Sequence, residues 1–100
     1  MPFQFSYPMT VAETISRKLT EALAPARLDV VDESHLHAGH VGARPEGETH
    51  FRVHIVADAF DGKSRVDRQR LVYGILSEEL ADRVHALALT TRTPAEDEAA

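Results

Sequence analysis

The segment THFRVHIVA, residues 49–57, constrains the fold more than any other part of the chain. Apolar and polar residues alternate along it: the apolar ones are Phe51, Val53 and Ile55, and the polar ones between them are Arg52 and His54. A period of two is typical of a β-strand that buries one face and turns the other outward. The chain is therefore expected to build a sheet with one apolar face.

A helix and a further strand are predicted to follow this strand. Ser64 can cap the helix, with Asp67 in the position of a capping box. An apolar stripe predicts a helix that extends as far as residue 80; it consists of Val66, Leu71, Val72, Ile75, Leu76 and Leu80. The segment VHALALT, residues 84–90, is predicted as a strand. One long helix between two strands suits a right-handed crossover that joins parallel strands.

The N-terminal half adds a helix and a strand. Thr10 and Glu13 form a capping-box pattern ahead of apolar residues at helical spacing, and Pro25 is expected to end that helix. RLDVVDE, residues 27–33, is predicted as a short strand that pairs antiparallel with residues 49–57 across a loop. Near the C-terminus, Thr93, Pro94 and Glu96 predict a short helix.

These elements predict an α+β fold in the order α-β-β-α-β-α, with a three-stranded mixed sheet and helices packed on one face. We expect a flexible N-terminal arm at residues 1–9, one domain at 10–96 and an acidic tail at 97–100. A length of 100 residues agrees with a single domain.

Composition excludes several classes of protein. The chain has no cysteine, so it can form no disulfide and offers no thiolate ligand. It has no apolar run long enough for a membrane span and no pattern typical of a secretory signal, so a soluble, cytoplasmic protein is expected. Its net charge of −5 disfavours non-specific binding to nucleic acids.

One segment has the opposite charge. GKSRVDRQR, residues 62–70, carries Lys63, Arg65, Arg68 and Arg70 against Asp67 alone. This basic patch is either a solvated helix face or a surface that contacts phosphates.

Catalysis is not indicated. There is no cysteine nucleophile, and Ser34 beside His35 is not a triad pattern, because neighbouring residues rarely face each other. DGKS resembles the end of a phosphate loop, but Asp58 stands where that loop requires glycine. We expect a protein that is not an enzyme.

The histidines are the candidate ligands. His35, His37 and His40 lie within six positions in a glycine-containing loop, where they could share a metal ion or simply be solvated. His50 and His54 are interpreted as structural. His85 precedes a short strand and is either half-buried or directed at something bound.

Five segments together resemble the BolA family. They are LDVVDESHLHAGH, ETHFRVHIV, FDGKSRVDRQRLVYGILSEEL, VHALALTT and TPAE, and the resemblance covers residues 10–96. One departure is Gln69, where the family commonly has histidine, so a role for that histidine does not carry over.

The resemblance implies an αββαβ fold similar to class II KH domains. It also implies a partner, a monothiol glutaredoxin, with which BolA-like proteins share a [2Fe-2S] cluster in cluster trafficking or iron sensing. The glutaredoxin supplies a cysteine and a bound glutathione thiolate. The chain would be a monomer alone and a heterodimer with glutaredoxin, with no cluster of its own.

The histidine before the last strand, which is a cluster ligand in the family, matches His85. The family's second ligand is a histidine or cysteine in the loop between the first two strands. Without cysteine it must be a histidine here; His40 fits the family pattern best, with His37 and His35 as alternatives.

The resemblance also implies a competing function. BolA-like proteins are described as DNA-binding transcriptional regulators, and Lys63, Arg65, Arg68 and Arg70 could meet phosphates. A KH-type clamp needs Gly-X-X-Gly, and only Gly62 is present in that segment. An isolated zinc or copper site ranks third.

Overall fold

A computed structural model describes residues 10–34 and 49–100. The predicted N-terminal arm and the histidine-containing loop, with His35, His37 and His40, lie outside these residues. Within the described ranges, no helix is long and apolar enough to cross a membrane.

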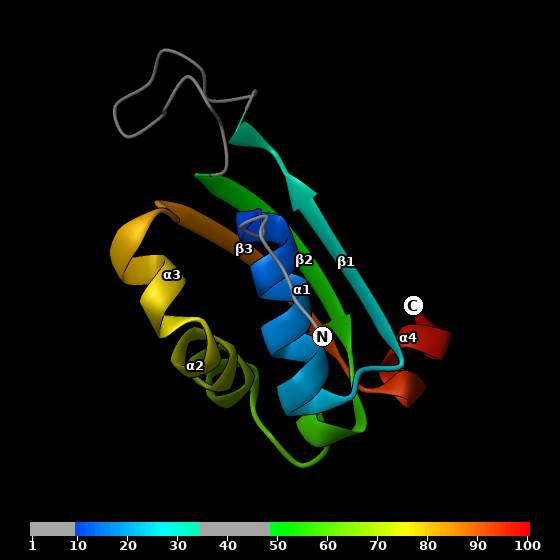
Figure 1. Cartoon of the computed structure of the whole chain (residues 1–100). Helices are drawn as coiled ribbons and strands as arrows, with labels where there is room; N and C mark the ends of the chain where they lie inside the picture. Colours follow the sequence, from blue (N-terminus) through cyan, green and yellow to red (C-terminus); the bar gives the residue numbers. More distant parts are fainter. Residues whose placement is uncertain (1–9, 35–48) are drawn as a thin grey trace, which may run out of the picture.

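The sheet has three strands in the order β1-β2-β3, as expected. These are β1 (Arg27–Asp32), β2 (His50–Val56) and β3 (Ala86–Arg92). β1 pairs antiparallel with β2, and β2 pairs parallel with β3. Figure 1 shows the end of β1 and the starts of β2 and β3 at the same end of the sheet.

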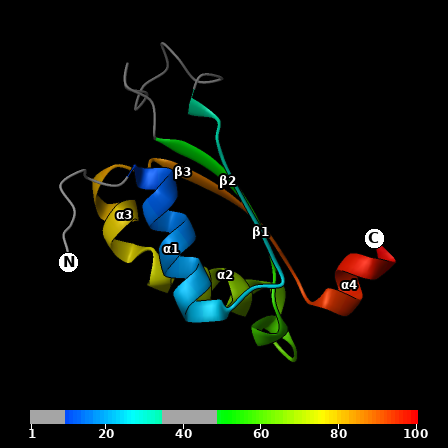
Figure 2. The same cartoon turned by 45° about the vertical axis from the view of Figure 1, so that its right-hand side comes forward.

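Three helices cover one face of this sheet: α1 (Val11–Leu23), α2 (Arg65–Ile75) and α3 (Ser77–Asp82). α4 (Pro94–Ala99) follows β3 and lies apart from this layer (Figure 2). A short 3₁₀ helix, η2 (Asp58–Phe60), joins β2 to the turn before α2.

The core lies between α1, α2 and the apolar face of the sheet. Phe51, Val53 and Ile55 are buried, as the alternation predicted, and Arg52 on the other face is exposed. The other residues of this core cluster are Ile15, Leu19, Leu23, Ala57, Phe60, Val72, Leu76 and Val84.

The predicted caps fix the helix starts. Thr10 and Glu13 form a reciprocal capping box, with Glu13 N–H donating to Thr10 Oγ1 at 3.1 Å and Thr10 N–H donating to Glu13 Oε1 at 2.9 Å. Thr93 and Glu96 form the same box at the start of α4. α4 continues to Ala99, so it contains three of the four residues that the sequence assigned to an acidic tail.

The prediction of a single long helix after Ser64 is wrong, because the structure has two helices there, α2 and α3, divided at Leu76. Leu76 has φ −100° and ψ 20°, outside helical values, and its side chain is 1% exposed. Gly74 just before it is a poor helix former. Beyond the bend, Glu78 and Glu79 accept hydrogen bonds from Lys18 Nζ of α1 at 2.6 and 3.1 Å. Tertiary contacts and a weak helical residue thus override the apolar stripe.

The third strand was predicted two residues too early. It begins at Ala86, which pairs with His50, and ends at Arg92, which pairs with Val56, so its length follows that of β2. Val84 is buried and His85 lies in the connection before the strand.

Candidate functional site

The backbone of His85 is fixed by the start of β2. His85 N–H donates to Thr49 C=O at 2.7 Å, and Ala86 N–H donates to the same carbonyl at 3.2 Å. Val84 is buried and donates its N–H to Glu79 C=O at 2.9 Å. The side chain of His85 is nevertheless exposed. An exposed imidazole on a fixed backbone suits a ligand that meets a partner at the surface.

Ser34 and Thr49, which flank the undescribed segment 35–48, are held together. Thr49 N–H donates to Ser34 Oγ at 2.9 Å, and His50 N–H donates to the same oxygen at 3.1 Å. Ser34 is anchored in turn by Asp32 Oδ1, which accepts from its hydroxyl and its N–H. Both Ser34 and Thr49 are buried. The residues on either side of the histidine-containing segment are therefore held at one point, and Thr49 at that point also holds the backbone of His85.

His50 lies beside His85, and the sequence analysis did not predict that these two histidines are close together. Their ring centroids are 6.4 Å apart, with ring planes tilted by 32°. His50 Nδ1 is 2.8 Å from Thr49 Oγ1, so the Thr49 hydroxyl helps to orient that ring. The two histidines are 35 positions apart, and only the parallel register, which pairs His50 with Ala86, brings them together.

His54 lies away from this site. It is four residues further along β2, about 13 Å at the usual rise of a strand. Its Nε2 is 3.5 Å from Asp97 Oδ1 of α4. This contact agrees with the structural role predicted for His54.

The two histidines at this end of the sheet offer nitrogen donors. No group of three or more histidine, cysteine, aspartate or glutamate side chains gathers as a metal site within residues 10–34 and 49–100. His85 and His50 are the imidazoles that the described structure brings together there. Neutral nitrogen donors fit one iron of a [2Fe-2S] cluster, provided that another protein supplies thiolates to the other iron.

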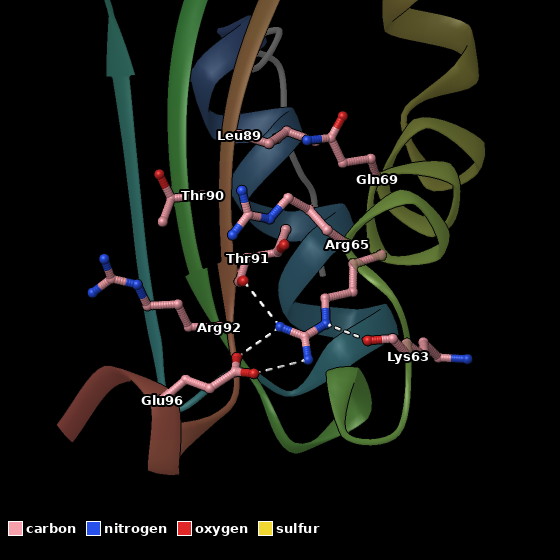
Figure 3. Close-up of a pocket in the computed structure, with 9 residues that line it drawn as sticks. Lys63, Arg65, Gln69, Leu89, Thr90, Thr91, Arg92 and Glu96 are labelled. Atoms are coloured by element: carbon pink, nitrogen blue, oxygen red, sulfur yellow. Dashed lines mark hydrogen bonds and ion pairs between the residues drawn. The ribbon is translucent and has the colours of Figure 1, made fainter. Parts of the chain in front are cut away.

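The basic segment forms a second candidate site at the other end of β3. A groove of about 720 Å³ is lined by Lys63, Arg65, Arg68, Gln69, residues 89–92 and Glu96. Figure 3 shows the start of α2 facing β3 across this groove, with Glu96 of α4 at its base.

Arg68 is not an exposed cation of this groove. It is 9% exposed, and its guanidinium donates to Lys63 C=O, Thr91 C=O and both carboxylate oxygens of Glu96 at 2.7–3.2 Å (Figure 3). These bonds to Arg68 and Thr93 lower the pKa of Glu96 to about 2. Arg68 thus links α2, β3 and α4, and its charge is used inside the protein.

Of the other three basic residues in this segment, two line the groove and one does not. Lys63 and Arg65 are exposed and line the groove. Arg70 is exposed but does not line it; its Nη1 lies 3.5 Å from Asp67 Oδ1. The four cations named from the sequence therefore do not form one patch.

Comparisons with known proteins point to a single family. The family model for BolA-like protein matches residues 19–96. SufE-like protein 1, chloroplastic/mitochondrial, from Arabidopsis thaliana is 49% identical over 86 residues, which are 82% of this chain and 23% of that protein. DNA-binding transcriptional regulator BolA from Escherichia coli (strain K12) is 45% identical over 85 residues, 85% of this chain and 77% of that one.

Among solved structures, the BolA domain of SufE1 from Arabidopsis thaliana superimposes with a TM-score of 0.80 at 46% identity, covering 90% of this chain and 99% of that domain. The chain spans only about a quarter of the length of the whole SufE-like protein. That relative's name refers to organelles, so the cytoplasmic location expected from the sequence stays a prediction.

Proposed function

Because the chain belongs to the BolA-like family, we propose that it pairs with a monothiol glutaredoxin and shares a [2Fe-2S] cluster with it, in cluster trafficking or iron sensing. One observation carries this proposal. His85 is exposed and its backbone is held by Thr49, the residue at which the histidine-containing segment rejoins the fold.

His85 serves as the fixed ligand. The two hydrogen bonds to Thr49 C=O fix its backbone before a partner arrives, so little backbone conformational entropy is lost when the imidazole binds iron. The His50 ring lies beside it, with the two ring centroids 6.4 Å apart.

His40 serves as the second ligand, with His37 and His35 as alternatives. His40 is six residues after Ser34, a stretch of chain that spans at most about 20 Å. Since Ser34 is bonded to Thr49 beside the His85 backbone, each of the three histidines is within chain reach of His85.

Histidine ligation raises the reduction potential of a [2Fe-2S] cluster, because neutral imidazoles leave it less negative than thiolates do. The chain itself contributes nitrogen donors only, so the thiolates come from the glutaredoxin cysteine and its glutathione. We expect no stable cluster on the isolated chain, a heterodimer with glutaredoxin and no enzymatic activity.

The test is to add the chain to a monothiol glutaredoxin that carries its cluster and to record the visible circular dichroism. The wild-type chain should change the spectrum, and His85→Ala should abolish that change while keeping its own far-ultraviolet spectrum. His54→Ala, a histidine change outside the site, is the matched control. A wild-type visible spectrum in His85→Ala would refute the assignment.

DNA binding is the second candidate. The Escherichia coli relative is named as a DNA-binding transcriptional regulator, and Lys63 and Arg65 are exposed on one groove. If the chain binds duplex DNA there, Arg65→Ala should weaken binding to all sequences alike and reduce its salt dependence. No binding at physiological salt would remove this function.

A further inference from the structure

The outer edge of β3 carries backbone groups that point away from the sheet. Ala86 N–H and Arg92 C=O are bonded toward β2, to Thr49 C=O and from Ala57 N–H. Backbone groups of successive strand residues alternate in direction. Those of Leu87, Leu89 and Thr91 therefore point outward.

One of these outward groups is already satisfied. Arg68 Nη1 donates to Thr91 C=O at 3.2 Å, which confirms that Thr91 faces outward. Among the described residues, no hydrogen bond reaches the outward groups of Leu87 and Leu89. The edge thus presents donors and acceptors that another strand could pair with.

The groove beside this edge is basic. Lys63 lines it from the turn before α2 and Arg65 lines it from α2 (Figure 3). Arg92 of β3 also lines it, but its Nη1 lies 3.3 Å from Asp97 Oδ1, so its charge is paired. The acidic residue in the groove, Glu96, is already neutralised by Arg68 at 2.7 Å. The groove therefore has a net positive charge on a chain whose net charge is −5.

We propose that an extended acidic segment of a partner protein adds to the free edge of β3 as a fourth strand and places its carboxylates against Lys63 and Arg65. Backbone pairing to Leu87 and Leu89 gives affinity, and carboxylates at alternate positions give specificity. The groove with Lys63 and Arg65 lies beside residues 89–92, away from His85, and backbone pairing to Leu87 and Leu89 involves no iron ligand. The inference therefore does not depend on the cluster.

The groove suits a peptide better than a single-stranded nucleic acid. Among the residues that the structure describes, no aromatic ring lines it, and base stacking on aromatic side chains is the usual source of affinity for single strands.

The test uses the full chain and a fluorescein-labelled peptide, Thr-Glu-Val-Glu-Val-Glu-Thr, whose binding is measured by fluorescence anisotropy. Arg65→Glu should weaken binding by about tenfold or more, because it replaces attraction with repulsion. Arg70→Glu makes the same charge change on the same helix outside the groove and should have a much smaller effect. His85→Ala should have none.

Two methylated peptides test strand addition itself. Methylation of the amide nitrogens on one edge of the peptide should abolish binding, and methylation on the other edge should leave it intact, since only one edge pairs with β3. The proposal would be overturned if both methylated peptides bound equally well, or if Arg65→Glu and Arg70→Glu weakened peptide binding equally. It would also be overturned if the wild-type chain did not bind the unmethylated peptide. So would tighter, Arg65-dependent binding of an oligothymidylate.

Discussion

At the scale of single residues, the Arg68 guanidinium joins three elements that are distant in sequence. From α2 it contacts the preceding turn through Lys63 C=O, the end of β3 through Thr91 C=O, and α4 through Glu96. It also lies 5.8 Å from the centre of the Phe60 ring. Arg68 therefore stabilises the end of the molecule that carries the basic groove.

Arg68→Ala should lower the free energy of unfolding by about 2 kcal/mol, because the partly buried carbonyls of Lys63 and Thr91 and the Glu96 carboxylate lose a charged donor. Arg70→Ala, an exposed change on the same helix, should alter it by less than about 0.5 kcal/mol. Urea denaturation of both variants measures the difference. Equal stability of the two variants would contradict the role given to Arg68.

The ion pair between Arg68 and Glu96 should make the stability of the fold depend on pH in the acid range. The folded-state pKa of Glu96, about 2, lies below its ordinary value of 4.5. Its contribution is therefore complete above pH 4.5 and is lost as pH falls toward 2. Glu96→Gln keeps an oxygen acceptor for the cap but loses the charge. It should lower Tm at pH 6 and reduce the fall in Tm between pH 4.5 and 2, whereas Glu98→Gln on the same helix should do neither.

At the scale of elements, local sequence patterns predicted the strands and the helix caps. The features that they did not predict depend on tertiary contacts. The alternation in β2 and the boxes at Thr10 and Thr93 are local, so the sequence alone reveals them. The bend at Leu76 and the approach of His50 to His85 depend on residues far apart in the chain. Arg68 looked like a surface cation because its partner, Glu96, is 28 positions away.

Two glycines around α2 should respond in opposite directions to alanine. Gly74 is exposed within the helix and a Cβ there meets nothing within 4 Å, so Gly74→Ala should raise stability by about 0.5–1 kcal/mol. Gly62 has φ 76°, where a Cβ is unfavourable, so Gly62→Ala should lower stability by about 1 kcal/mol. Thermal denaturation of both variants measures this; a Tm decrease in Gly74→Ala would show that the helix needs glycine there.

At the scale of the whole molecule, the parallel pair β2 and β3 separates two surfaces. One end of β3 lies beside His85 and the two residues that flank the histidine-containing segment, and the other end lies beside the basic groove. A strand of this length keeps the two about 20 Å apart. The proposed glutaredoxin contact at His85 and the proposed carboxylate contacts at Lys63 and Arg65 therefore lie toward different ends of β3.

The central claim is that nitrogen atoms of this chain bind the iron of a shared cluster, with His85 as one donor. Pulsed electron paramagnetic resonance of the reduced complex tests it directly, with ¹⁵N-histidine in this chain only and an unlabelled glutaredoxin. We predict strong ¹⁵N couplings from two histidines in the wild-type complex and none with His85→Ala, because the cluster then stays with the glutaredoxin alone. A reduced complex that forms without any ¹⁵N coupling would contradict the claim.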